Sequence, residues 1–203
     1  MKSINKYITE KLKIKKTNKP SYNYHPKTKE ELKELLEKLI KERGNEGDFN
    51  DIDVSKITDM SSLFYQIRKF NGNISNWDVS NVTDMQGMFD YCNLFNQPLN
   101  DWDVSKVTDM DYMFNECTSF NQPLDKWDVS KVENMEYMFA YCESFNQDIS
   151  DWNVSNVINM RYMFCSCKSF NQDLSNWKVS NVTNNKDIFY GCPIEEKNKP
   201  KFK

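Results

Sequence analysis

Residues 102–126 read WDVSKVTDMDYMFNECTSFNQPLDK, and this unit recurs along most of the 203-residue chain. Tryptophan returns at a constant interval, and an isoleucine takes its place one step before the first of them. The six starting positions are Ile52, Trp77, Trp102, Trp127, Trp152 and Trp177. A constant interval of this length predicts a repeat protein, in which each unit buries its apolar side chains against its neighbours.

The apolar side chains of the unit fall in columns that keep one residue type from repeat to repeat. β-Branched residues around Val-Thr-Asp-Met and the Phe-Asn-Gln run favour short parallel strands. The segment 110–117 places apolar residues at i, i+3, i+4 and i+7, which predicts one or two helical turns. The expected fold class is therefore a repeat solenoid of six stacked 25-residue coils, made of short parallel strands plus short helical turns.

The segment before the repeats has the pattern of a capping helix. Thr28 and Glu31 can form a capping box, leucines follow on one face, and Gly44 can end the helix. Such a helix would cover the apolar end of the first coil. The expected organisation is a basic, flexible arm at 1–20, a capping helix segment at 21–51, the repeats at 52–192 and a charged tail at 193–203.

Composition and charge exclude several classes of protein. Residues 44–192 carry 22 acidic and 10 basic side chains, an unfavourable balance for binding nucleic acid. No apolar run approaches the roughly 18 residues of a membrane span. The first residues, MKSINKYITEKLKIKK, lack the apolar core of a secretory signal, so a cytoplasmic location is expected. The chain has one histidine, so we expect no enzyme activity, no bound metal and no cofactor.

Three polar or thiol-bearing columns have structural interpretations. Five cysteines recur at the same interval as the tryptophans and Cys165 lies out of register; we expect all six to be free thiols, with Cys165 the most reactive. The asparagine column is expected to bond the backbone of neighbouring coils. An aspartate column, from Asp53 to Asp128, is expected to cap turns rather than bind calcium.

The motif W-[DN]-V-S-[NK]-V-x-[DN]-M-x-x-M-F-x-x-C-x-x-F-N-Q resembles the BspA-like leucine-rich-repeat surface proteins of bacteria, including the mycoplasma-type lipoprotein repeats. The resemblance covers the larger part of the chain, from Ile52 to Cys192. It implies a leucine-rich-repeat-like solenoid, and a role in adhesion or protein binding at a cell surface.

The variable columns are the candidates for function. One carries tyrosine in three consecutive repeats, and the preceding column changes charge there. The predicted partner-binding residues are Tyr112, Tyr137, Tyr162, Asp111, Glu136 and Arg161. Tyrosine offers a rigid contact area with a polar tip, although these rings could simply cover the edge of the core.

We therefore expect a monomeric, non-catalytic module that binds another protein. The alternative is a structural or virion-associated component docked through residues 1–20, with the basic side chains Lys11, Lys13, Lys15 and Lys16 as the contact.

Overall fold

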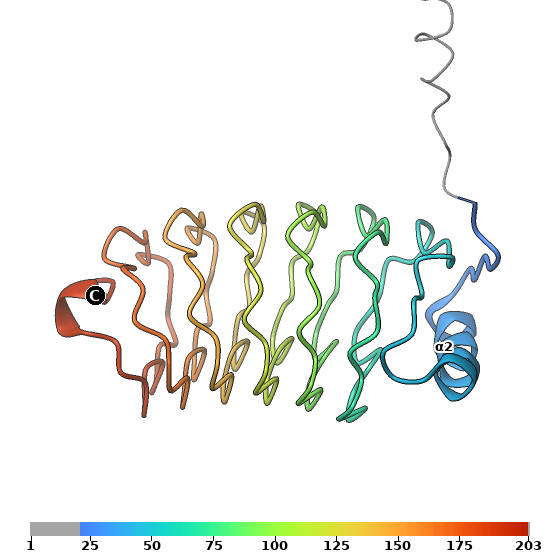
Figure 1. Cartoon of the computed structure of the whole chain (residues 1–203). Coiled ribbons are helices and arrows are strands. Elements are labelled where there is room, and N and C mark those ends of the chain that lie inside the picture. Colours follow the sequence, from blue (N-terminus) through green and yellow to red (C-terminus); the bar gives the residue numbers. More distant parts are fainter. Residues whose placement is uncertain (1–20, 203) are drawn as a thin grey trace, which may run out of the picture.

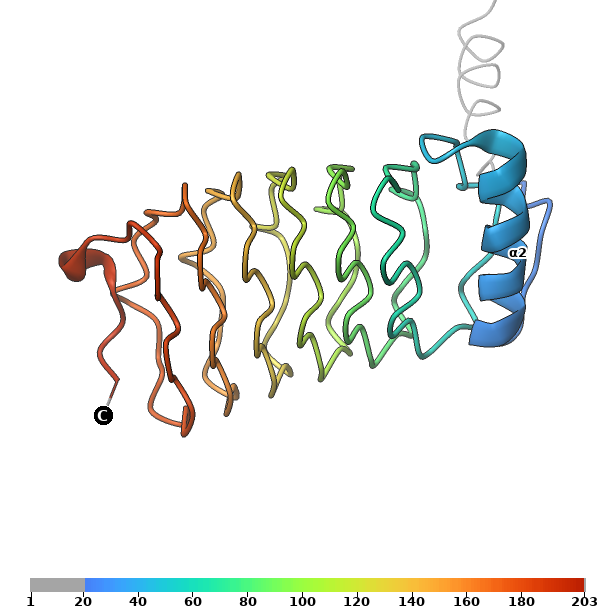
Figure 2. The same cartoon turned by 90° about the horizontal axis from the view of Figure 1, so that it is seen from below.

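The computed structural model describes residues 21–202, in which the repeats form loops that lie side by side in one stack (Figure 1). Helix α2, Lys29–Arg43, lies across the N-terminal end of the stack, and the short 3₁₀ helix η1, Glu196–Asn198, lies at the other end (Figure 2). The arm expected at 1–20 falls outside the described residues. Between residues 21 and 202, no helix has the length and apolar character needed to cross a membrane.

Helix α2 confirms the predicted cap. The side chain of Thr28 accepts a hydrogen bond from the backbone N–H of Glu31, and Gly44 ends the helix with φ at 79°. The leucines on one face are buried against the first loop: Leu32, Leu36 and Leu39. At the C-terminal end of the helix, Arg43 pairs with Asp51 at 2.7 Å.

Successive loops are joined by a ladder of backbone hydrogen bonds in which alternate N–H groups point to the next loop. In the repeat at 102–126, four N–H groups donate to carbonyl oxygens of the following repeat; they belong to Met110, Tyr112, Phe114 and Glu116. The N–H groups between them instead close turns within their own loop, as from Met113 to Met110 at 3.2 Å. Each loop is thus held both to itself and to its successor.

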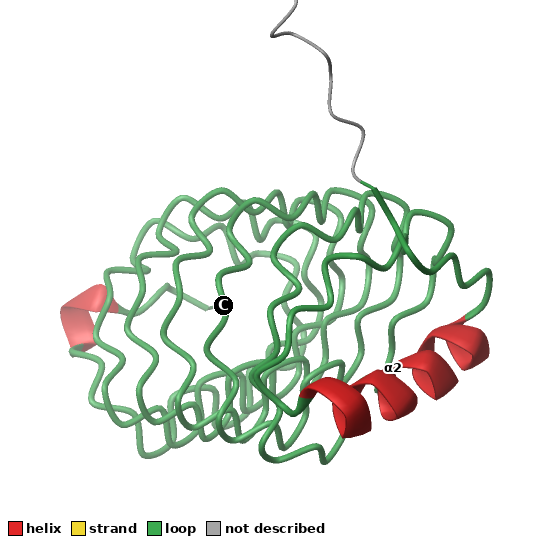
Figure 3. Cartoon of the chain, turned by 45° about the vertical axis from the view of Figure 1, so that its right-hand side comes forward, coloured by secondary structure: helices red, strands yellow, loops and turns green. Residues whose placement is uncertain are grey.

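The predicted strands and helical turns are wrong, and with them the leucine-rich-repeat-like solenoid expected from the sequence. Residues 21–202 contain no strand (Figure 3). The β-type pairing between consecutive repeats is limited to isolated parallel bridges, such as that of Asp84 with Asp109. The segment 110–117 is a run of turns in which Tyr112 and Glu116 have φ of 54° and 61°. Left-handed residues interrupt a right-handed helix, and alternate N–H groups are used by the neighbouring loop, so no i to i−4 pattern forms.

Two ladders of phenylalanine rings run through the centre of the stack. One contains Phe89, Phe114 and Phe139, with ring centroids 5.5 and 5.6 Å apart. The other includes Phe120 and Phe145, at 6.1 Å. The ladders meet within each loop, at 4.3 Å between the rings of Phe139 and Phe145. Since each unit is too small to enclose its own rings, burial comes from the neighbouring loops.

Tryptophan and cysteine are buried beside these rings and donate hydrogen bonds across loops. The indole Nε1 of Trp127 donates to the carbonyl of Leu99 at 2.9 Å, and the other four tryptophans make the equivalent bond. The thiol of Cys142 donates to the carbonyl of Phe114 at 2.9 Å. Burial raises the pKa of the Cys142 thiol well above its usual value.

All six cysteines are free thiols, but Cys165 is not the exposed one. Cys165 is buried, with 4% of the residue exposed, and its carbonyl accepts the N–H of Tyr141 from the preceding loop at 2.8 Å, whereas Cys192 in the last repeat is half-buried. Reaction with a thiol reagent depends on access and on the thiolate. The expectation that Cys165 reacts first is therefore not supported by its burial.

The asparagine and aspartate columns make the hydrogen bonds predicted for each of them. The side chain of Asn96 accepts the backbone N–H of Asn121 at 3.0 Å, and the same bond recurs along the asparagine column. Asp103 accepts the backbone N–H of Ser105 at 3.1 Å, and others in its column do likewise. The asparagine side chains thus join neighbouring loops, and the aspartate side chains fix turns within a loop.

Candidate interaction surface

Three stacked rings on the outside of the loops define the tyrosine column: Tyr112, Tyr137 and Tyr162. Each residue has a left-handed backbone, with φ between 53° and 55°, and each is half-buried. Ring centroids are 4.6 Å apart between the first pair and 4.8 Å between the second. The structure thus brings together the three predicted tyrosines as one continuous aromatic surface.

The fold does not require tyrosine at these positions. The equivalent residues of the other repeats are Ser62, Gly87 and Asp187, and all three have φ between 53° and 56°. The same backbone conformation therefore accepts serine, glycine or aspartate. Ring stacking contributes only about 0.5–1.5 kcal/mol per pair beyond the burial of area.

The charged column beside the tyrosines differs from the prediction. Asp111 is buried, with 8% exposure, so it is not the surface residue expected from the sequence. Glu136 and Arg161 are half-buried and pair with each other at 3.3 Å. The guanidinium of Arg161 also lies 4.9 Å from the ring centre of Tyr162. This corner of the column is consequently a planar cation held between a tyrosine and an acid.

Two buried carboxyl groups lie close to the N-terminal end of the column. Burial, partly offset by a hydrogen bond from Asn115 at 2.7 Å, raises the pKa of Asp90 to about 6. Burial together with the charge of Asp109 raises the pKa of Asp111 to about 6. One oxygen of Asp111, Oδ1, has no hydrogen-bond partner among the described residues.

Replacing Asp111 with asparagine is expected to stabilise the fold at neutral pH. The folded pKa lies above the ordinary value of 3.8, so the charged form is disfavoured in the fold and stability falls as pH rises through 4 to 6. Removing the charge should raise the free energy of unfolding by on the order of 1–3 kcal/mol at pH 7.5.

The gain from Asp111→Asn should be close to zero near pH 4, where the carboxyl in the fold is already protonated. Urea unfolding of both proteins at the two pH values measures this difference. An equal gain at both would mean that the charge is not the cause.

A shallow cavity of about 290 Å³, open to solvent, lies where the tyrosine column stops. Gly87 occupies the column position there, and the side chain of Asp90 lines the cavity together with Tyr65 and Tyr112. Sequence reasoning did not identify this cavity, although a glycine within a column of tyrosines was a signal for it. Asp90 was also visible as an acid at a position where later repeats carry Asn115, Ala140 and Cys165.

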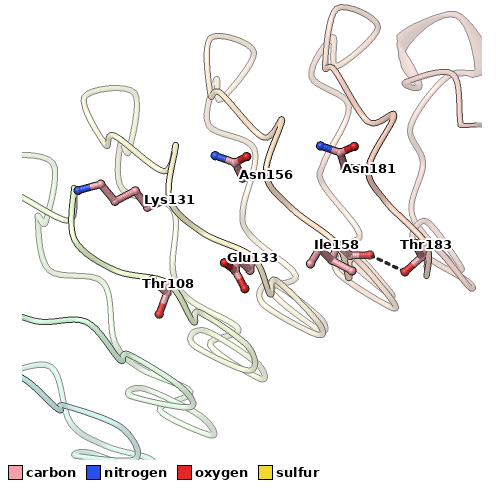
Figure 4. A pocket seen from close by; sticks show the side chains of 7 residues that line it. All are labelled: Thr108, Lys131, Glu133, Asn156, Ile158, Asn181 and Thr183. Atoms are coloured by element: carbon pink, nitrogen blue, oxygen red, sulfur yellow. Dashed lines mark hydrogen bonds between the residues drawn. The ribbon is translucent and has the colours of Figure 1, made fainter.

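A larger, shallow groove of about 670 Å³ follows the Val-Thr segments of the loops (Figure 4). It is lined by Thr108, Lys131, Glu133, Asn156, Ile158, Asn181 and Thr183. The amide groups of Asn156 and Asn181 donate to backbone carbonyls of the preceding loop, at 2.6 and 2.7 Å. Its polar groups therefore serve the fold and do not converge on a common point.

The geometry of the described residues provides no metal centre. No group of three His, Cys, Asp or Glu side chains among residues 21–202 could hold a metal ion. The single histidine, His25, is exposed and lies 3.2 Å from Asp53. That aspartate already accepts the hydroxyl and the N–H of Ser55.

Comparison with known proteins gives one match. A family model described as "Mycoplasma protein of unknown function, DUF285" matches residues 31–140 and 123–202, which together span most of the chain. No curated protein and no solved structure matches this chain.

Proposed function

The chain belongs to the DUF285 family, and we propose that it is a non-catalytic module that binds another protein through the tyrosine column. Because the repeated motif resembles that of the BspA-like surface proteins, we also propose that the chain is related to them and has an adhesion-type role. One observation carries it: three consecutive repeats place tyrosine at a position where the fold accepts serine, glycine or aspartate.

The chemistry of the column suits a protein contact. Protein interfaces concentrate their binding energy in a few aromatic or arginine side chains, at about 2 kcal/mol or more each. The column offers rings already fixed by stacking, so little side-chain entropy is lost on binding. Glu136 and Arg161 add a polar rim, but Asp111 does not, because it is buried.

Replacing all three tyrosines by serine should abolish partner capture and leave the fold intact. Ser62 shows that serine adopts the required backbone, with φ at 56°. We expect the melting temperature to change by only a few degrees, since the lost stacking is worth about 1 kcal/mol per pair. The measurement is recovery of bound protein by immobilised wild-type and variant chains, with thermal unfolding recorded in parallel.

A matched control removes three exposed apolar side chains elsewhere: Leu94, Ile158 and Tyr190, each changed to serine. This control should retain capture. If the tyrosine variant unfolds, the column is an edge of the core. If the variant folds and still binds, the contact lies elsewhere, and removal of residues 1–20 then tests the alternative of docking through the arm.

A further inference from the structure

The tyrosine column ends at an open place for one more planar group. Tyr112 stacks on Tyr137, but no ring among residues 21–202 stacks on its other face, because Gly87 has no side chain. The cavity of about 290 Å³ lies there, with Tyr65 and Tyr112 as walls. The neighbouring rings are 4.6 to 4.8 Å apart, so the column itself sets the separation at which a further planar group would stack.

The chemistry around this place favours a planar cation. Asp90 lines the cavity and is 8% exposed, and the one side-chain hydrogen bond it accepts comes from Asn115 to Oδ1. A buried carboxylate is stabilised by an opposite charge at hydrogen-bond distance. Residues 44–192 carry 12 more acids than bases, which would attract a basic partner.

The same column already contains such an arrangement. The guanidinium of Arg161 lies 4.9 Å from the ring centre of Tyr162 and donates to Glu136 at 3.3 Å. A guanidinium is flat, stacks on tyrosine and pairs with carboxylates, whereas an ammonium group lacks the planar face. The open end beside Gly87 offers a tyrosine ring and an acid without such a group.

We propose that the cavity beside Gly87 binds the guanidinium group of an arginine side chain from the protein partner. The inference rests on the proposed function, and it names the anchor that the tyrosine column receives. The guanidinium stacks on Tyr112 and donates to Asp90. The guanidinium is then the next planar group in the stack of tyrosine rings, and it is supplied by the partner.

The test uses the full ¹⁵N-labelled chain and the probe acetyl-Gly-Arg-Gly-amide. A single anchor of this kind should bind with a Kd of about 1–10 mM, and should shift the amide signals of Gly87, Asp90 and Tyr112. The citrulline peptide has the same shape without the charge and should bind about tenfold more weakly. The tyrosine peptide should bind no better than citrulline.

Two variants locate the site. Gly87→Tyr fills the cavity, because a Cβ there meets only ordinary contacts at 3.6 Å and the backbone matches that of the other tyrosines; it should abolish binding. Asp90→Asn should weaken binding about tenfold and leave the cavity open. Asp187→Tyr makes a tyrosine substitution at the same position of the last repeat and should leave binding unchanged.

Several results would overturn the proposal: no shift at about 10 mM peptide, equal binding of citrulline, preference for tyrosine, or binding that survives Gly87→Tyr. These outcomes are separable from failure of the proposed function. If the triple serine variant loses partner capture but the wild-type chain does not bind the arginine peptide, the tyrosine column remains the proposed contact and only the arginine site is rejected. If the wild-type chain binds the arginine peptide but the triple serine variant still captures the partner, the proposed role of the tyrosine column in partner binding is rejected instead.

Discussion

Replacing Phe139 by alanine is expected to lower the free energy of unfolding by about 3–5 kcal/mol, the range for truncating a large buried aromatic side chain. Phe139 is fully buried and its ring packs on four others: Phe114, Phe145, Trp152 and Phe164. Because the ladder passes through this ring, the loss affects the contacts on both sides. Urea unfolding at neutral pH measures the change.

The matched control is Phe189→Ala at the last rung of the same ladder. Its ring is half-buried and stacks on Phe164, at 5.7 Å, as its single ring partner among the described residues. We expect a clearly smaller loss, since stability in a repeat array is a sum of units and their interfaces. Equal losses at the two positions would contradict the nearest-neighbour description of the stack.

Replacing Gly72 by glutamine is expected to destabilise the protein by about 1–3 kcal/mol, the usual cost of overpacking. The substitution restores the residue found at this position in later repeats, such as Gln122, so sequence consensus favours it. The structure opposes it, because a Cβ at Gly72 would lie 2.7 Å from Cδ2 of Phe49, closer still to Cε2 of the same ring, and 2.8 Å from Cε2 of Phe70. The ring of Phe49 comes from the segment between α2 and the first loop, and the later repeats carry leucine or isoleucine, such as Ile74 and Leu99, at the equivalent position.

A double-mutant cycle with Phe49→Ala separates the two explanations. In that background the contact with Phe49 is gone and only the contact with Phe70 remains. The counterparts of Phe70, such as Phe120, stand beside glutamine in later repeats, so Gly72→Gln should cost little or become favourable. The new amide could then bond a neighbouring loop, as Gln122 does with Asn96 at 3.1 Å. If Gly72→Gln stabilises the protein in the wild-type background, the ring of Phe49 must move to make room for the glutamine side chain, and the prediction of overpacking is wrong.

The contrast between sequence pattern and three-dimensional packing also explains which predictions from the sequence were wrong. In the segment 110–117 the spacing of Met110, Met113 and Phe114 correctly predicted which side chains are buried. The spacing did not predict the backbone, because turns with left-handed residues at Tyr112 and Glu116 place the same side chains inward. Asp111 was expected on the surface for its charge, yet the adjacent loops cover it.

The sequence alone determined the features that depend on side-chain type and local hydrogen bonds. These are the tryptophan-marked repeat, the buried columns, the cap from Thr28 to Gly44 and the asparagine ladder, since an apolar or amide group repeated in register has few other stable placements. Tertiary structure alone decided whether an N–H such as that of Tyr112 bonds its own loop or the next, and left a cavity beside Gly87. Those outcomes depend on the distance between loops and on how neighbouring side chains fill the space, and neither is encoded in the spacing of residues within a single repeat.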